Sequence, residues 1–223
     1  MIIKPLPNIY QIKGYANSYV IEFEKELIII DTGMDKKAKE LLEAIEKTGK
    51  EPKAVLLTHG HLDHTNGLAK IKEKYPEMKV IASEEDKPAV EGKVMLLPKG
   101  IKGFFFRLMM PFMRYKGVKV DETFKDEWNG FKVIKTPGHT KGSVSLLLEL
   151  KGKKILFCGD LILNVKNKLS LPPDEFNLNR EEMIESIGKI SKVDFDCLLS
   201  GHGEAITKDA KEKVKEFLEN LKL

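Results

Sequence analysis

The chain has 223 residues, of which 42% are hydrophobic, enough to bury the core of one large α/β domain. Its 38 basic and 34 acidic residues leave a net charge of only +4, which excludes a polyanion-binding tail. The sequence has neither an apolar run of roughly 18 residues nor a signal-peptide core near its start, so we expect a cytoplasmic protein without a transmembrane segment.

Two features of the composition point to the source and to the redox state. Charged residues reach 32% of the chain and are mostly lysine and glutamate, with three arginines and one glutamine, which is typical of heat-adapted proteins. We therefore expect a thermophilic source. Cys158 and Cys197 each lie in an apolar strand-like run, which predicts buried reduced thiols and no disulfide.

Short β-branched runs alternate with helical patterns along the chain, as in a mixed sheet with helices packed outside it. We predict strands at 18–22, 27–31, 54–58, 79–82, 131–136, 143–148, 154–159 and 197–200. Helices are predicted at 36–48, 65–75, 180–191 and 208–221 from apolar residues spaced three and four apart. No repeat or linker interrupts this alternation, so we expect a single domain over residues 1–223.

One segment, about residues 92–120, breaks the alternation and is predicted to be an insertion over the core. It combines phenylalanine and methionine with lysine and arginine, and it has no acidic residue between Glu91 and Asp121. Pro111 would end or kink a helix, so we expect two short helical pieces.

A cluster of metal-ligand side chains follows the predicted strand at 54–58. His59 and His61 are two apart on an extended segment and can project to the same side, and the turn into the next helix brings Asp63 and His64 close to them. Such nitrogen and oxygen donors suit a catalytic zinc. Packing explains the cluster poorly, because four polar groups so close together would need several buried partners.

Three further candidates stand at the ends of later strands. His139 follows a Pro-Gly turn after 131–135. Asp160 follows the run 154–157 after Cys158 and Gly159, and His202 lies between two glycines after 197–199. In open α/β sheets, ligands bind beyond the carboxyl ends of strands, so these residues can converge. Either histidine alone would more often be a surface or core residue, but together with the cluster both are predicted to be ligands.

At this point the chain resembles the metallo-β-lactamase superfamily. Its H-x-H-x-D-H motif is matched by residues 59–64, its later His, Asp and His by His139, Asp160 and His202, and its early Asp motif by Asp31, Thr32 and Gly33. The resemblance covers about residues 17–205. It implies an α/β (α+β) fold, a four-layer αββα sandwich with metal ions at one edge between the two halves.

The resemblance also implies the ligand sets. His59, His61 and His139 would hold one ion, Asp63, His64 and His202 would hold the other, and Asp160 would bridge them. Asp31 would accept a hydrogen bond from a ligand histidine. We expect two divalent ions, zinc in the first place, with iron or manganese as alternatives, since His and Asp sites accept all three.

Two such ions about 3.5 to 4 Å apart lower the pKa of a bound water to near 7, so a metal-bound hydroxide is the expected nucleophile of a hydrolase. Asp63 would orient this nucleophile or take its proton. The bridging Asp160 is similar to the pattern of glyoxalase II, lactonases and phosphodiesterases.

The leading substrate is a small molecule, a thioester or related ester, although the chain lacks the C-terminal helical domain with which glyoxalase II enzymes bind glutathione. A phosphodiesterase or endoribonuclease is the alternative, because the basic insertion could meet phosphates or nucleic acid. A lactonase is disfavoured because Leu161 to Asn164, and no tyrosine, follow Asp160. A non-catalytic metal binder is the remaining alternative, and the complete ligand set argues against it.

The insertion has more apolar side chains than can all pack against the core. Phe104, Phe105 and Phe106 are consecutive, so they cannot all face one core from a helix or a strand. We predict a pocket wall for an apolar acyl chain, formed by Phe105 and Met109 with Arg107 or Arg114 near an anionic end. Core packing, a homodimer contact and a membrane surface are the alternatives.

Overall fold

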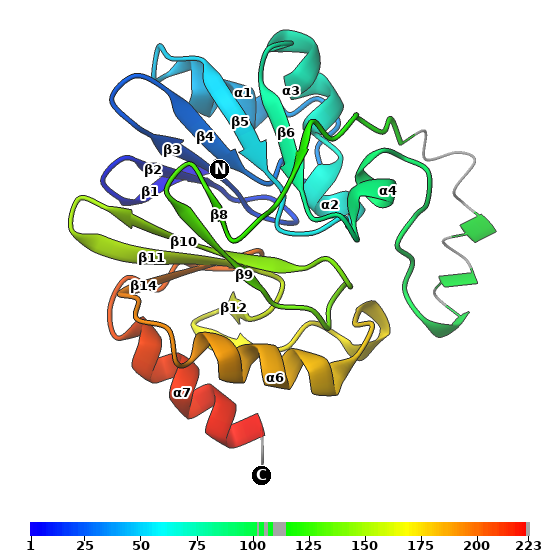
Figure 1. Cartoon of the computed structure of the whole chain (residues 1–223), viewed down its shortest axis with the longest axis vertical. Coiled ribbons are helices and arrows are strands. Elements are labelled where there is room, and N and C mark those ends of the chain that lie inside the picture. Colours follow the sequence, from blue (N-terminus) through cyan, green and yellow to red (C-terminus); the bar gives the residue numbers. More distant parts are fainter. Residues whose placement is uncertain (102, 105–106, 109–114, 222–223) are drawn as a thin grey trace. The chain divides into compact units, whose positions relative to one another are not determined.

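The structure is a computed structural model that describes residues 1–101, 103–104, 107–108 and 115–221. The chain divides into two compact units (Figure 1). The first unit consists of Met1–Leu96 and Tyr115–Thr123, and the second unit of Leu97–Arg114 and Phe124–Leu223. That the two units form a single domain stays a prediction.

The first unit is built on a seven-stranded sheet whose strands follow one another in chain order. The first four strands pair antiparallel, and the later pairs, from β4 and β5 onwards, are parallel. The strands are β1 (Ile2–Leu6), β2 (Ile9–Ile12), β3 (Ser18–Glu22), β4 (Leu27–Ile30), β5 (Pro52–Leu56), β6 (Lys79–Ala82) and β7 (Glu122–Thr123).

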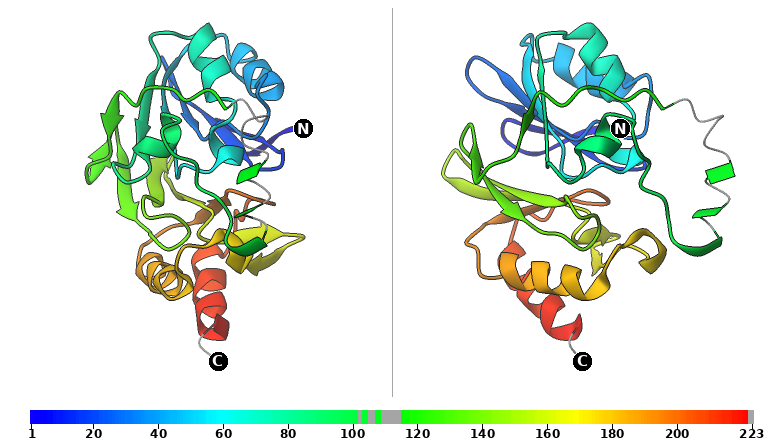
Figure 2. Two further views of the ribbon diagram at one scale, coloured as in Figure 1. Left: turned by 90° about the vertical axis from the view of Figure 1, so that its right-hand side faces the viewer. Right: turned by 45° about the vertical axis from the view of Figure 1, so that its right-hand side comes forward.

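Four helices belong to the first unit, namely α1 (Lys39–Glu46), α2 (Leu62–Thr65), α3 (Leu68–Lys74) and α4 (Lys87–Val90). Helices α1 and α3 lie on one face of the sheet (Figures 1 and 2), where Leu41 and Ile71 pack with Ile29 and Val55. Side chains of the opposite strand face, such as Ile28, are fully buried as well. Both faces of these strands are therefore apolar, which explains their unbroken β-branched runs.

The second unit has a five-stranded sheet in the order β14-β11-β10-β9-β8. Neighbours pair antiparallel, except that β11 and β14 run parallel. The strands are β8 (Glu127–Trp128), β9 (Phe131–Lys135), β10 (Val144–Leu150), β11 (Lys153–Gly159) and β14 (Cys197–Ser200). A separate hairpin of β12 (Leu163–Val165) and β13 (Lys168–Ser170) and a short 3-10 helix, η1 (Asp174–Phe176), complete the unit before α6.

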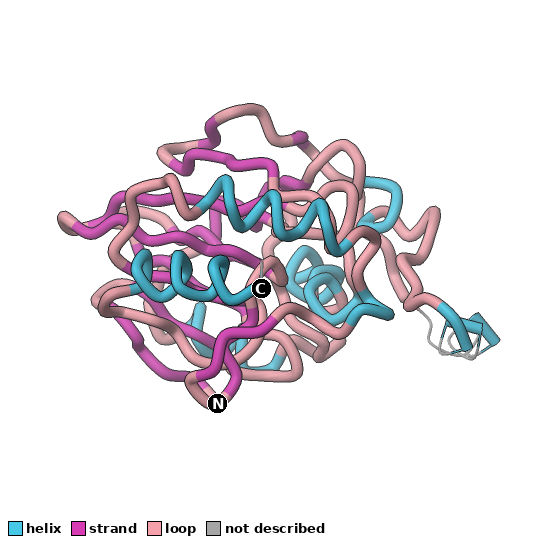
Figure 3. The backbone as a smooth tube through the Cα atoms, turned by 90° about the horizontal axis from the view of Figure 1, so that it is seen from below, coloured by secondary structure: helices cyan, strands magenta, loops and turns pink. Residues whose placement is uncertain are grey.

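Helices α6 (Arg180–Ile190) and α7 (Ala210–Leu221) cover one face of this sheet. Seen from below in Figure 3, both helices lie in front of the strands, and Ile187 and Val214 belong to one buried cluster with Leu156 and Leu198. Helix α6 starts where Asn179 accepts a hydrogen bond from the Glu182 N–H, the normal role of an asparagine N-cap.

The insertion at 92–120 is attached to both units at its described ends. At its return, the Val118 N–H donates to the Val90 carbonyl (3.1 Å), and a Cβ on Gly117 would lie 2.2 Å from the Glu91 carbonyl oxygen. Near its start, the Lys99 N–H donates to the Glu175 carbonyl at 2.6 Å. The expected break at Pro111 lies outside the described residues.

Most predicted elements are confirmed, with two corrections. The helix predicted at 36–48 starts only at Lys39, because Ala38 has a φ of 47° and Asp35 accepts the Lys39 N–H at 3.0 Å. The helix predicted at 65–75 is interrupted at Gly67, whose N–H donates to the Gly33 carbonyl at 3.2 Å. A Cβ at this position would lie 2.5 Å from the Thr32 carbonyl oxygen, so the close approach requires glycine. The short elements α4, η1, β7 and β8, the strands β1 and β2, and the β12–β13 hairpin were not predicted from the sequence.

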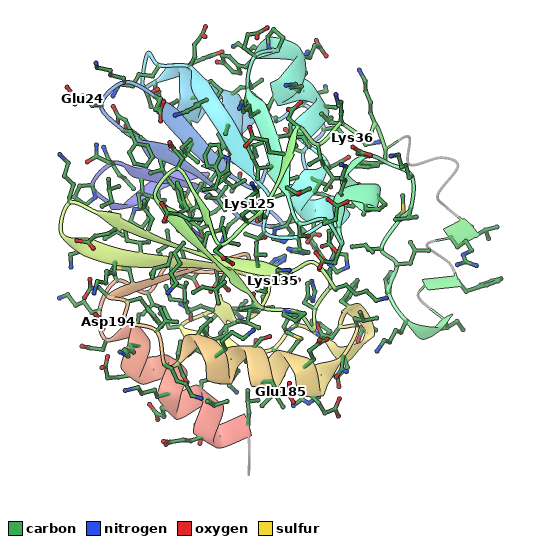
Figure 4. The ribbon with its side chains drawn as sticks, viewed as in Figure 1. Glu24, Lys36, Lys125, Lys135, Glu185 and Asp194 are labelled. Carbon is green, nitrogen blue, oxygen red and sulfur yellow. The ribbon has the colours of Figure 1, made fainter. Side chains whose placement is uncertain are left out.

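Charged side chains cover the outer surfaces of both units. The six that Figure 4 labels, Glu24, Lys36, Lys125, Lys135, Glu185 and Asp194, are all exposed. Asp194 pairs with Lys154 (2.7 Å) and Lys211 (3.3 Å), which lowers the pKa of its carboxyl. Over the described residues, every helix is too short or too polar to cross a bilayer.

Candidate metal centre

The first unit gathers four of the predicted ligands just beyond β5. The chain stays extended up to His61, which is the N-cap of α2, so Asp63 and His64 fall in the first turn of that helix. The ring of His59 lies 4.9 Å from that of His61 and 4.1 Å from that of His64, measured between centroids. Asp63 Oδ2 lies 3.9 Å from His64 Nε2. Local backbone geometry thus brings all four side chains together.

Asp31, directly after β4, holds this cluster in place. Its Oδ1 accepts the Thr58 N–H (2.8 Å), and its Oδ2 accepts the Thr58 hydroxyl (2.7 Å) and lies 2.8 Å from His64 Nδ1. The carboxylate is 2% exposed and has a φ of 54°, a conformation that costs energy for a residue other than glycine. In this strained conformation the single carboxylate of Asp31 accepts hydrogen bonds from three donors, all in the segment that carries the predicted ligands.

These contacts determine which nitrogen of each imidazole keeps its lone pair. A carboxylate only accepts, so His64 carries its proton on Nδ1. The Thr58 hydroxyl donates to Asp31 and therefore accepts from His59 Nδ1, 3.1 Å away. In both histidines the lone pair then sits on Nε2, the atom that can coordinate a metal ion.

The second unit gathers the other three ligands at the ends of β9, β11 and β14. Asp160 Oδ2 lies 3.5 Å from His139 Nε2 and 3.2 Å from His202 Nε2. His139 and Asp160 are buried, whereas the side chain of His202 is 18% exposed. One carboxylate oxygen of Asp160 thus lies close to the imidazoles of both later loops.

Glycines let these loops approach their neighbours closely. Gly138, before His139, has a φ of 125°, and a Cβ there would lie 2.4 Å from the Met183 nitrogen of α6. Gly203, after His202, has a φ of 90°, and a Cβ there would lie 1.7 Å from the Asn164 carbonyl oxygen. Both positions exclude any side chain, so the turns that carry the two histidines depend on glycine.

Asn177 is a functional residue that the sequence analysis missed. Its Oδ1 lies 2.9 Å from His139 Nδ1, while its amide group donates to the Pro172 carbonyl at 2.9 Å. The second bond fixes which end of the amide accepts, so His139 donates from Nδ1 and keeps its lone pair on Nε2. The two residues are 38 positions apart, and no local pattern in the sequence connects them.

The sequence analysis also missed Thr58, whose hydroxyl contacts both Asp31 and His59. A hydroxyl residue directly before the first histidine of the motif is the signal that could have identified it.

The described residues contain His and Asp groups that could hold metal ions, and all seven predicted ligands belong to these groups.

Of the four predicted pocket residues, the structure describes only one. Arg107 is described and is exposed, whereas Phe105, Met109 and Arg114 lie outside the described residues. Cys158, two residues before Asp160, is a buried free thiol whose Sγ donates to the Ser200 hydroxyl at 3.6 Å. Burial raises its pKa to about 12, so it is a neutral core side chain at pH 7.

Comparison with known proteins identifies the family of the chain. The sequence profile of the metallo-beta-lactamase superfamily matches residues 12–202, a range that covers most of both units and contains all seven predicted ligands. The chain belongs to the metallo-β-lactamase superfamily. A variant of a metallo-beta-lactamase from Cronobacter sakazakii has the same fold, with a TM-score of 0.74 and 19% identity over 99% of this chain and 94% of that one. The predicted fold class is confirmed.

Two curated relatives are similar over most of their length. A probable metallo-hydrolase of Bacillus subtilis, YflN, is 30% identical over 86% of this chain and 82% of its own. The hydroxyacylglutathione hydrolase GloC of Haemophilus influenzae is 27% identical over 90% of this chain and 91% of its own. The relatives thus include hydrolases of the superfamily.

Proposed function

We propose that this chain is a binuclear metal-dependent hydrolase that cleaves a thioester or a related ester. The observation that carries the proposal is the set of seven His and Asp side chains at strand ends, in the order of the superfamily motif. The ligand sets proposed are His59, His61 and His139 for one ion and Asp63, His64 and His202 for the other, with Asp160 shared.

The residues present fit a divalent metal ion. Thr58, Asp31 and Asn177 leave a lone pair on Nε2 of His59, His64 and His139. The remaining donors are two further imidazoles and two carboxylates, so the set is the nitrogen and oxygen set that zinc, iron and manganese accept. When bound, two such ions activate water at neutral pH and polarise the oxygen of the bond under attack. Zinc is the ion we propose first.

Asp63 is the proposed catalytic residue of the chain itself. It sits in the first turn of α2, and its side chain is 20% exposed, so solvent and substrate can reach the carboxylate. Asp63 orients the attacking water and takes its proton as the carbonyl carbon is attacked. Replacement by asparagine preserves the shape but removes the base.

The thioester assignment is supported by the relative named a hydroxyacylglutathione hydrolase. This chain covers 91% of the length of GloC, so the similarity extends over nearly the whole of that relative. The basic insertion still makes a phosphodiester the second candidate.

A panel assay tests the assignment. Protein loaded separately with zinc, iron or manganese is given S-lactoylglutathione, acetyl and long-chain thioesters, a lactone, bis-p-nitrophenyl phosphate and single-stranded RNA. We expect thioesters to give the highest kcat/KM. Faster cleavage of bis-p-nitrophenyl phosphate or RNA would replace the thioester assignment with the phosphodiesterase alternative.

The Asp63→Asn variant tests the role of the base. Turnover should fall by about 10²- to 10⁴-fold with KM changed much less, the usual contribution of a positioned general base. Asp35→Asn is the matched control, because Asp35 is an exposed carboxylate of the same unit that accepts the Lys37 and Lys39 N–H groups. Unchanged turnover in Asp63→Asn removes this residue from the mechanism.

Metal content tests the binuclear site independently of any substrate. We expect about two equivalents per chain, because seven ligands exceed the four of a tetrahedral ion. Asp160→Ala should lower the occupancy of at least one site. Substantially less than one equivalent in metal-replete protein would overturn the proposal.

We also propose that the insertion forms the wall for the acyl chain. Replacing Phe105 and Met109 by alanine should raise KM for long-chain thioesters more than for acetyl thioesters, since each lost apolar contact removes about 1.5 to 3 kcal/mol. Equal loss for both substrates, or a change from dimer to monomer on a sizing column, would assign the segment to structure or to a homodimer contact.

A further inference from the structure

Asp86 is a buried carboxylate that is not one of the predicted ligands. Its side chain bonds to the loop between two predicted ligands and does not cap its own helix. It occupies the N-cap position of α4 and is 2% exposed, yet its side chain makes no capping hydrogen bond. An N-cap aspartate normally accepts an N–H from the first turn of its helix. Here Oδ2 accepts the N–H of Gly60 at 2.8 Å.

Gly60 is the residue between the first two predicted ligands, His59 and His61. A Cβ on Gly60 would lie 3.0 Å from Ala89 Cβ and 3.2 Å from Asp86 Cβ, so the loop rests directly on the first turn of α4. The helix therefore supports this backbone by contact as well as by a hydrogen bond.

Other contacts hold the loop on either side of Gly60. On one side, Asp31 accepts the Thr58 N–H at 2.8 Å, and on the other, the Thr65 hydroxyl donates to the His61 carbonyl at 3.1 Å. Asp86 acts between these two points, where the backbone turns from one ligand to the next. The direction of the Gly60 peptide sets where the two imidazoles can project.

The chemistry of the contact argues for more than packing. Burying a carboxylate is costly unless strong donors compensate it, and a hydrogen bond to an ionised acceptor is about twice as strong as a neutral one. The Asp86 N–H in turn donates to Ser83 Oγ at 3.2 Å, which fixes the start of α4. A buried acceptor on a well-supported helix end is suited to hold one peptide group at a fixed angle.

We propose that Asp86 is a positioning residue that holds the His59-Gly60-His61 backbone in the conformation that binds metal. The proposal rests on the metal site of the proposed function. Asp86 acts through Gly60 and touches neither metal nor substrate, so its effect should be seen in metal affinity before it is seen in any reaction.

The test uses the 223-residue chain and three variants. Asp86→Ala removes the acceptor, and Asp86→Asn keeps an amide oxygen that can accept the Gly60 N–H. Asp121→Ala is the matched control, because Asp121 Oδ2 likewise accepts a backbone N–H of the same unit, that of Val80, at 2.9 Å. Zinc affinity is measured by competition with a chelator, the visible spectrum of the cobalt(II) form reports the ligand geometry, and thermal unfolding of the metal-free protein reports folding.

We expect Asp86→Ala to weaken zinc binding about 10- to 100-fold, as loss of outer hydrogen-bond partners does in other sites, and to alter the cobalt spectrum. Asp86→Asn should restore most of the affinity, and Asp121→Ala should leave affinity and spectrum unchanged. Wild-type affinity in Asp86→Ala, no rescue by asparagine, or an equal loss in Asp121→Ala would each overturn the proposal.

A second route remains if Asp86→Ala does not fold. Gly60→Ala leaves Asp86 intact and introduces the Cβ that meets Ala89, and the further change Ala89→Gly removes that contact. Affinity should fall in the single variant and recover in the double variant, and undiminished affinity in the single variant contradicts the proposal. If the wild-type chain itself binds no zinc, the proposed function fails, whereas zinc binding that is insensitive to these changes defeats only the role of Asp86.

Discussion

Replacing Asp31 by asparagine exchanges one oxygen for an NH₂ group at the point where the carboxylate meets His64. The wild-type Oδ2 accepts the His64 Nδ1 proton at 2.8 Å and the Thr58 hydroxyl at 2.7 Å. The asparagine Oδ1 can still accept the Thr58 N–H, but its NH₂ group can only donate toward His64 Nδ1. The imidazole must then move its proton to Nε2, the nitrogen that would coordinate the metal.

The expected losses can be estimated from these bonds. Hydrogen bonds to a charged acceptor contribute about 1.5–3 kcal/mol and neutral ones about 0.5–1.5 kcal/mol, so Asp31→Asn should lower the free energy of unfolding by about 1–3 kcal/mol. A domain with about 5–15 kcal/mol of stability remains folded after such a loss. Metal affinity should fall about 10- to 100-fold, because the ligand tautomer is wrong.

Nitrogen-15 NMR of the imidazoles and zinc competition test this expectation together. The variant should show His64 protonated on Nε2 in the metal-free protein, with weaker zinc binding and a cooperative urea transition. Asp121→Asn, which alters a carboxylate that accepts the Val80 N–H, should change neither tautomer nor affinity. If His64 keeps its Nδ1 proton in Asp31→Asn, or if zinc binds as in the wild type, the reasoning from the tautomer is wrong.

Three further predictions concern stability. Gly203→Ala should destabilise the fold and reduce metal content, because Gly203 has a φ of 90° and a Cβ there would lie 1.7 Å from the Asn164 carbonyl oxygen. Gly130→Ala is the control, since Gly130 has a φ of 85° but open space around it, and this change should cost only about 1–2 kcal/mol. Similar urea midpoints for both variants would contradict this. Burial raises the pKa of Cys158 from 9.0 to about 12, so its contribution to stability is complete below pH 9 and is lost as the pH rises toward 12. Iodoacetamide should therefore label Cys158 only in unfolded protein, and rapid labelling of the native protein would refute its burial. The metal-free chain should unfold above the mesophile range of about 45–65 °C in calorimetry, and a midpoint inside that range would remove the case for a heat-adapted source.

The strands and the ligands could be predicted from the sequence because their signals are local. The apolar runs within 79–82 and 197–200 are short and continuous, and the observed strands have the predicted bounds. The metal motif lies in six consecutive residues, and each later ligand follows a strand end next to glycine. Backbone geometry then determines where these side chains point.

What could not be predicted depends on contacts between distant residues. At the break in the second helix the Gly67 N–H bonds to the distant Gly33 carbonyl, Asn177 reaches His139 across 38 positions, and Asp86 reaches Gly60 across 26. The N-terminal hairpin was missed because Pro5, Pro7 and Asn8 conceal its alternation. Periodicity records which face of an element is buried, but it does not record which polar groups meet there.

The closed base of the insertion has a consequence for how this protein can diversify. The Val118 N–H bonds to the Val90 carbonyl, so the segment leaves and re-enters the first unit at one point. The entropic cost of closing a loop rises by only about 0.6 kcal/mol for each doubling of its length. A different length of chain between Val90 and Val118 should therefore change the free energy of unfolding little, which makes these two residues the natural points for grafting another segment.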